Sequence, residues 1–386
     1  MKLINQCIQL FIAVVLVMAC NSAHLDLKPL SETEADYFDQ QIDYERAVRG
    51  IYAKMTDFFW YNNNDPIHKI WLLPGDDLTT SGSYPFEIFT TIQSGDGDLS
   101  TFYVASYRII ARANTVLQKI DMDKGRDKSV YATTADRDAN EGEALFLRGY
   151  IFYELWTFFG TSPMVIERIQ TQDKINPPSS EGTQLLDQAI DDFTKAADLL
   201  PASWDSQNAG RATKSSANGM LGKALVVRGT LSAQNADYTA AIAAFNKITD
   251  KQLVANYGDN FSVFHENNAE SLFEFQASQP ASDNVWLPND FDQAVGSMSA
   301  YRGFFNNAWS FWEQTPFIPT AKLMNLAASA DFNGDPRIPY IFDAGTTRIT
   351  KYMLEDQLSQ TGVGTVNNER LLRYADVLLL KAEAMN

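Results

Sequence analysis

The chain has 386 residues, of which 45% are hydrophobic and 20% charged, as in an ordinary globular protein. Its 48 acidic residues against 31 basic ones give a formal net charge of −17, which argues against a nucleic-acid partner because phosphate binding needs a basic surface. Two cysteines are too few for a disulfide-rich scaffold or a four-cysteine zinc site.

The first twenty residues have the pattern of a secretion signal. Lys2 precedes an apolar run, residues 10–19, which ends at Cys20. The run is shorter than the ~20 residues that span a bilayer, but it has the length of a signal-peptide core. Because Val17-Met18-Ala19-Cys20 resembles the bacterial lipoprotein box, we predict a signal peptide over residues 1–19 and acylation of Cys20, for example with palmitate. An ordinary signal peptide with an unmodified cysteine is the alternative.

Helical periodicity dominates the next two hundred residues. Apolar side chains recur every three or four positions in six segments, residues 43–58, 100–120, 136–159, 182–200, 213–231 and 238–249. The small and aromatic residues of the segment 236–245 resemble the second helix of a tetratricopeptide repeat. A helix pair of this kind must stack on a neighbour to bury its apolar face. We therefore predict an all-α fold with a helical repeat over about 43–250.

Two long irregular segments interrupt the helices. The first, residues 60–97, is rich in Pro, Gly, Asn and Asp, and the second, residues 277–317, is aromatic and irregular. Between them, residues 271–276 alternate in polarity, as a half-buried strand does. A final helix is expected over 370–386, where the sequence ends without a cap or a partner helix.

The sequence lacks a recognisable catalytic or metal-binding motif. Its histidines, His24, His68 and His265, have no metal-binding spacing, and no Gly-x-Ser-x-Gly elbow is present. Residues 331–336 resemble either a calcium loop or a turn, and the spacing favours the turn. We predict no cofactor, no metal and no catalytic residue.

Paired carboxylates leave one enzymatic alternative open. Asp76 and Asp77 follow Trp71, and Glu313 follows two further tryptophans, so that a glycoside hydrolase could draw its acid and base from them. With 48 acidic residues such neighbours also arise by chance, and capping or solvated surface roles are the simpler interpretation.

Several separated segments together resemble one known family. They are residues 143–150 (EALFLRGY), 159–163 (FGTSP), 210–214 (GRATK), 335–337 (DPR) and 373–379 (RYADVLL). In order and spacing they resemble the SusD/RagB family of surface lipoproteins over residues 20–386. The resemblance implies a tetratricopeptide-like all-α scaffold with long loops and minor β structure. It also implies a chain truncated at its C-terminus, because members commonly continue beyond the final helix.

The resemblance further implies a function and a location. Members are tethered to the outer face of the outer membrane, cover a SusC-like TonB-dependent transporter, and deliver glycans or, in one branch, peptides. Sugars are bound by flat aromatic faces bordered by polar groups on loops. The predicted residues for binding an oligosaccharide or polysaccharide are therefore Trp60, Tyr61, Trp71, Asp77, Tyr84, Trp286, Tyr301, Trp309 and Trp312. They all lie in the two irregular segments, which we call the first ligand loop (residues 60–97) and the second ligand loop (residues 277–317).

Overall fold

The computed structural model describes most of the chain beyond its N-terminal segment. The described residues are 37–59, 66–80, 84–90, 92–233, 235–277, 300–301, 317–343, 345, 348–352, 364–365 and 367–386. The predicted signal peptide and Cys20 lie outside them.

Helices form most of the described structure, which confirms the predicted all-α class with minor β. They are α3 (Gln41–Lys54), α4 (Thr56–Phe59), α5 (Pro66–Leu72), α6 (Pro85–Ile88), α7 (Gly97–Lys124), α8 (Thr134–Phe159), α9 (Gln184–Leu199), α10 (Lys214–Ser232), α11 (Asn235–Asn246), α12 (Ala321–Ala327) and α13 (Tyr374–Met385). Among the described residues, none of these helices combines the length and the apolar character that a membrane span requires.

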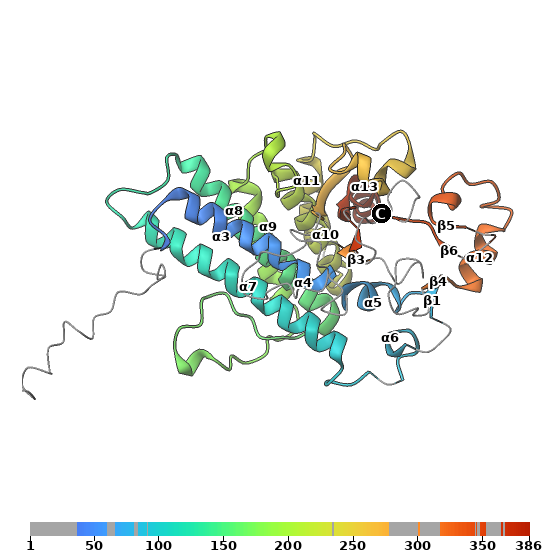
Figure 1. Cartoon of the computed structure of the whole chain (residues 1–386), viewed down its shortest axis with the longest axis horizontal. Helices are drawn as coiled ribbons and strands as arrows, with labels where there is room; N and C mark the ends of the chain where they lie inside the picture. The colour runs from blue at the N-terminus through green and yellow to red at the C-terminus, as the bar shows by residue number, and fades with distance from the viewer. Residues whose placement is uncertain are drawn as a thin grey trace, which may run out of the picture.

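Consecutive helices pack on one another in chain order, as Figure 1 shows. α8 packs on α7 and α9, α10 on α9 and α11, and α13 on α10 and α11, while α3 lies across α7 and α8. α8 is the centre of this arrangement, because every residue from Gly142 to Leu155 is buried. α9 shows the one-sided pattern of a covering helix, with Leu186, Ala189 and Phe193 on its buried face.

The end of the chain differs from the prediction. The segment expected to begin a helix at Arg370 forms strand β8 (Glu369–Arg373), and α13 starts only at Tyr374. β8 pairs antiparallel with β2 (Ser271–Phe275), a partner about one hundred residues away that no local pattern reveals. β2 is a strand as predicted, but all five of its residues are buried rather than alternately exposed. Its polar residue Glu274 is buried because hydrogen bonds satisfy its carboxylate.

The first ligand loop is less irregular than the sequence indicates. It contains α5, α6 and the short strand β1 (Leu78–Thr79), which pairs with β4 (Ile318–Pro319). Two further short strand pairs form among the described residues. β3 (Ala300–Tyr301) pairs with β7 (Gly364–Thr365), and β5 (Phe342–Asp343) pairs with β6 (Arg348–Ile349). Elements this short are fixed by contacts with distant residues, so propensity does not reveal them.

The crossing of α10 and α11 depends on a missing side chain. A Cβ atom built on Gly222 would lie only 2.2 Å from Cε1 of Phe245, a distance far shorter than a van der Waals contact. Glycine therefore allows the Phe245 ring to pack directly on the backbone of α10.

We predict that Gly222→Ala lowers the free energy of unfolding by roughly 1–3 kcal/mol, since the ring and the helix must move apart. Chemical denaturation followed by circular dichroism measures the effect. Gly97→Ala is the matched control, because a Cβ atom there meets nothing within 4 Å and the residue begins α7. Equal stability of the two variants would contradict the close crossing.

Candidate functional site

The two ligand loops meet at their bases. β1 belongs to the first loop and β4 directly follows the second, and Leu78 is paired with Pro319. Thr320 strengthens this junction, because its backbone N–H donates to the carbonyl of Asp77 at 2.9 Å and its Oγ1 donates to that of Asp76 at 2.6 Å. α5, α6, β1 and β4 consequently gather at one end of the molecule (Figure 1).

The other ends of the loops also leave the scaffold at neighbouring points. Phe59, directly before the first loop, stacks on Phe275, two residues before the second, with ring centroids 4.5 Å apart. α4 also lies against β3 within the second loop. The structure therefore brings together the ends of the two segments that the sequence predicts to carry the ligand residues.

Trp71 lies at this junction, half-buried in α5. Its Nε1 donates to Oε2 of Glu154 at 3.2 Å, and its ring meets that of Phe59 edge-on with centroids 6.2 Å apart. Because the polar group of the indole is bonded inside the protein, Trp71 can offer a ligand only the open part of its ring.

Glu154 is an unusual acid beneath the loops. Its burial in α8 raises the pKa of the carboxyl to about 7, against the opposing effects of the Trp71 indole, Lys223 and the Tyr150 hydroxyl. The group is therefore partly protonated near neutral pH, and protonation removes the cost of burying a charge there.

Tyr84 is held by a buried cation. It precedes α6 in an extended conformation, and Nζ of Lys69 lies 5.5 Å from the centroid of its ring. Lys69 is completely buried and donates to Oδ1 of Asp98 at 2.9 Å, in the first turn of α7. The cation–π contact and the ion pair together fix the half-buried tyrosine beside the junction.

Asp77 and its neighbour Asp76 have exposed side chains. Asp76 forms an ion pair with Lys322, whose hydrogen bond holds the pKa of Asp76 below its usual value. A general acid needs a raised pKa, so Asp76 is poorly suited to that role in a hydrolase. Glu313, the other candidate acid, lies outside the described residues.

The remaining predicted ligand residues are not placed by the structure. Trp60, Tyr61, Trp286, Trp309 and Trp312 lie outside the described residues. Tyr301 is described only through its backbone, which pairs with Gly364 in β3 and β7. Their contact with ligand stays a prediction.

A cleft of about 500 Å³ beside the loop bases was not foreseen from the sequence. It lies between α3, the turn before α10 and the end of β2, and its lining includes Arg46, Arg49 and Arg211; we call it the arginine cleft. Gly210 in the turn has a φ of 86°, and a Cβ atom there would lie 2.2 Å from the Gln276 side chain. No spacing rule connects Arg211 with Arg46 and Arg49, which lie more than 160 positions earlier, so only the fold reveals this cleft.

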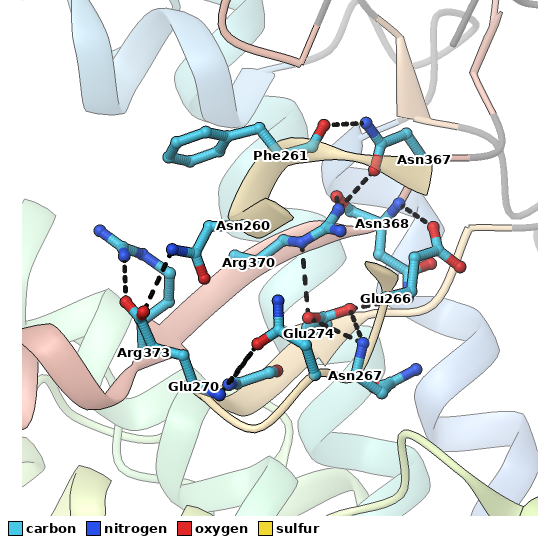
Figure 2. A network of polar contacts seen from close by, with 12 residues as sticks. Asn260, Phe261, Glu266, Asn267, Glu270, Glu274, Asn367, Asn368, Arg370 and Arg373 are labelled. Atoms are coloured by element: carbon cyan, nitrogen blue, oxygen red, sulfur yellow. Dashed lines mark hydrogen bonds and ion pairs between the residues drawn. The ribbon is translucent and has the colours of Figure 1, made fainter. Parts of the chain in front are cut away.

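A buried polar network supports the end of β2, as Figure 2 shows. Glu274 accepts hydrogen bonds from the backbone N–H of Asn267 at 3.2 Å and from Nδ2 of Asn368 at 2.8 Å, and its Oε1 lies 3.4 Å from Nε of Arg370. Asn368 also donates to Oε1 of Gln276, which lines the cleft. The network thus fixes one wall of the arginine cleft.

The described residues offer no obvious metal site. Within them, no three His, Cys, Asp or Glu side chains come together to hold an ion. In the segment weighed as a calcium loop, Oδ2 of Asp335 accepts from Nη2 of Arg337 at 2.6 Å, and Gly334 has a φ of 82°. These contacts are those of a turn closed by an aspartate.

Comparison with known families gives one match over more than half of the chain. A family model for SusD-like proteins, described as starch-binding and associating with the outer membrane, matches residues 24–225. SusD-like protein P2 of Formosa agariphila is 24% identical, with 91% of this chain and 71% of the relative covered. A SusD-like protein of Bacteroides ovatus is 23% identical, with 68% of this chain and 47% of the relative covered.

Solved structures share the fold. A SusD superfamily protein from Bacteroides vulgatus has a TM-score of 0.69 at 23% identity, covering 90% of this chain and 76% of that one. A laminarin-binding SusD-like protein has a TM-score of 0.71 at 19% identity, covering 90% and 80%. Surface glycan-binding protein A of Bacteroides thetaiotaomicron, in complex with laminarihexaose, has a TM-score of 0.69 at 19% identity, covering 89% and 78%.

The raised pKa of Glu154 predicts a pH-dependent stability. An exposed glutamate releases its proton near pH 4.5, whereas Glu154 in the folded protein holds it until about pH 7. The folded state therefore binds the extra proton in this window, and the free energy of unfolding falls as the pH rises through it, by at most about 1.4 kcal/mol per pH unit. We predict that Glu154→Gln loses less stability than the wild type between pH 5 and pH 8.

Thermal unfolding at several pH values measures this difference. The glutamine stays neutral, and its side-chain oxygen can still accept the Trp71 hydrogen bond. Glu383→Gln, an exposed change on α13, is the control and should keep the wild-type slope. Parallel pH profiles of Glu154→Gln and the wild type would show that Glu154 does not titrate in this window.

Proposed function

We propose that this chain, which belongs to the SusD-like family, captures an oligosaccharide at the outer membrane and passes it to a TonB-dependent transporter. The observation that carries the proposal is the junction of the two ligand loops at one end of a rigid helical scaffold. Loops held at both ends on packed helices are a usual place for binding residues. Because the chain belongs to a family described as starch-binding, we propose that its ligand is a carbohydrate.

The chemistry of the junction suits sugar binding. Trp71 and Tyr84 are both half-buried and anchored, so the open parts of their rings need little further ordering to receive the apolar face of a sugar. The exposed Asp77 supplies a carboxylate that accepts from hydroxyl groups. The aromatic residues predicted elsewhere in the two loops would extend this surface.

A glycan is favoured over a peptide and over catalysis. Two of the similar solved structures are of a laminarin-binding protein and of a glycan-binding protein with laminarihexaose. For catalysis, the hydrogen bond and ion pair with Lys322 hold the pKa of Asp76 below its usual value, so Asp76 is poorly suited to be the protonated acid that an inverting or retaining hydrolase uses. We therefore propose binding without turnover.

The attachment that we propose is a lipid on Cys20, which holds the protein at the outer membrane facing the exterior. A net charge of −17 gives no attraction to anionic lipid headgroups. Attachment would then depend on the acyl chains, and two or more together anchor a protein stably.

We expect the loop tryptophans to contribute most of the glycan affinity. Trp286→Ala or Trp309→Ala should weaken binding roughly thirtyfold, since a central aromatic in a binding surface contributes ~2 kcal/mol or more. Isothermal titration with a neutral oligosaccharide such as a laminarin fragment measures it. Phe264→Ala is the control, because Phe264 is an aromatic residue with 69% of its surface exposed outside the two loops.

Unchanged affinity in both tryptophan variants would remove the loops from the binding site. Asp77→Asn should weaken binding by only about 1 kcal/mol, the value of a single hydrogen bond. If the wild type released shortened sugars over many hours and Asp77→Asn did not, the protein would be an enzyme.

The lipid anchor has its own test. Cys20→Ala should move the protein from the membrane fraction to the soluble fraction and abolish labelling with a radioactive or clickable fatty acid. Cys7→Ala is the control, because that cysteine lies inside the predicted signal peptide and should leave labelling intact. An unlabelled Cys20→Ala protein that remained fully in the membrane would contradict the anchor.

A further inference from the structure

We propose that the arginine cleft is a second binding site, which receives the carboxylate or sulfate group of an acidic saccharide. The inference rests on the proposed function, since it assumes that the chain binds saccharides. The inference goes beyond the proposed function by naming a separate site and the charge of the ligand. Nothing in the loop aromatics requires an acidic sugar.

The cleft is cationic in a chain that is strongly acidic. Its lining carries three arginines and one acid, Glu274, and that acid faces Arg370 at 3.4 Å. Arg211 is neutralised by the buried Glu143 behind it. The two arginines of α3, Arg46 and Arg49, therefore supply the charge that an anion would meet.

Arg49 is the better placed of the two. It is exposed, and it makes no hydrogen bond or ion pair with any residue that the structure describes. Burial raises the pKa of the Glu143 carboxyl, and the charge of Arg49 is among those that oppose this rise. Nη1 of Arg46 lies 3.5 Å from Oδ1 of Asp43, and 63% of the Arg46 side chain is exposed. Glu45, on the same helix, is bonded to Gln41. A guanidinium with all five donors open is suited to a bidentate contact with a carboxylate or sulfate.

Arg211 gives the cleft a rigid wall. Its Nε donates to Oε1 of Glu143 at 2.7 Å, its Nη1 donates to Oδ1 of Asn208 at 3.0 Å, and its guanidinium lies 3.9 Å from the centroid of the Trp204 ring. Tyr52 also holds Glu143 in place, because the Tyr52 hydroxyl donates to Glu143 at 2.8 Å and accepts from the backbone N–H of Ala212 at 2.9 Å. A ligand entering the cleft would therefore find its partners already ordered.

The other lining groups favour a sugar over a peptide. The exposed Gln207 lines the cleft with an amide that can both donate to and accept from hydroxyl groups, while the amides of Asn208 and Gln276 are bonded to neighbouring residues and hold the wall in place. Gln276 also directly precedes the second ligand loop, which starts at residue 277. An oligosaccharide held by the loop could thus extend into the cleft, whose volume of about 500 Å³ is that of a small-ligand pocket.

Titration calorimetry on the full-length protein in detergent tests the proposal with three oligosaccharides of equal length, one neutral, one carrying a uronate and one carrying a sulfate. We expect at least one acidic probe to bind about tenfold more tightly than the neutral one. Arg49→Ala should abolish this preference and leave the neutral affinity unchanged, and Arg49→Lys should keep part of it. Lys195→Ala, which removes an exposed cation of α9, is the matched control and should keep the full preference.

Three results would overturn the proposal. The first is a wild type without preference for either acidic probe, and the second is a preference that survives in the double variant Arg46→Ala/Arg49→Ala. The third is an acidic peptide that binds more tightly than both acidic sugars through Arg49. Since both arginines are exposed on α3, melting curves should show that these variants fold.

The same experiment separates this inference from the proposed function. If the neutral probe binds and the acidic probes gain nothing, the cleft assignment fails while glycan capture stands. If the neutral probe does not bind but the acidic ones bind through Arg49, the cleft assignment stands and capture by the loop aromatics fails.

Discussion

Buried charge on the central helix is the constraint that organises this protein. α8 is covered on all sides, yet it carries Glu143, Arg148 and Glu154 within its buried stretch. An uncompensated charge in such a place costs several kcal/mol, so each of these side chains must find a partner on another element. Arg148 meets both carboxylate oxygens of Asp192 in α9, at 2.7 and 2.8 Å, and also donates to Asn114 of α7 at 2.8 Å. One side chain thereby links three consecutive helices.

The other two buried ionisable side chains connect the scaffold to the arginine cleft and to the ligand loops. Glu143 holds Arg211, and through it the turn that forms the arginine cleft. Glu154 accepts the indole N–H of Trp71, and so fixes α5 beneath the ligand loops. Glu143, five residues before Arg148, therefore positions the cleft, and Glu154, six residues after Arg148, positions the ligand loops. A change in the packing of α8 would therefore shift both the ligand loops and the arginine cleft, even though neither lies on that helix.

The sequence predicts those features that have a local signature. Amphipathic periodicity is local, and it predicts the helices from α7 to α11 within a few residues of their observed ends. It wrongly predicts the start of a helix at β8 because Leu371 and Leu372 fit either period, and only pairing with β2 decides between them. The bond between Trp71 and Glu154 joins residues 83 positions apart, and the cleft joins α3 to a turn that lies even further along the chain. Contacts of this kind depend on the stacking of the helices, so a single sequence could name the loop aromatics but not the groups that anchor them.

The charge of the whole chain and the charge of the cleft act over different distances. A net charge of −17 repels an acidic sugar at long range, and ions screen this repulsion beyond about 8 Å at physiological ionic strength. The arginines would act at contact distance, which is well within this screening length. Salt would therefore speed the approach of an acidic ligand through the weakened repulsion while it loosens the contact with Arg49 only moderately. Selection between acidic and neutral sugars would then be expressed mainly in the rate of release.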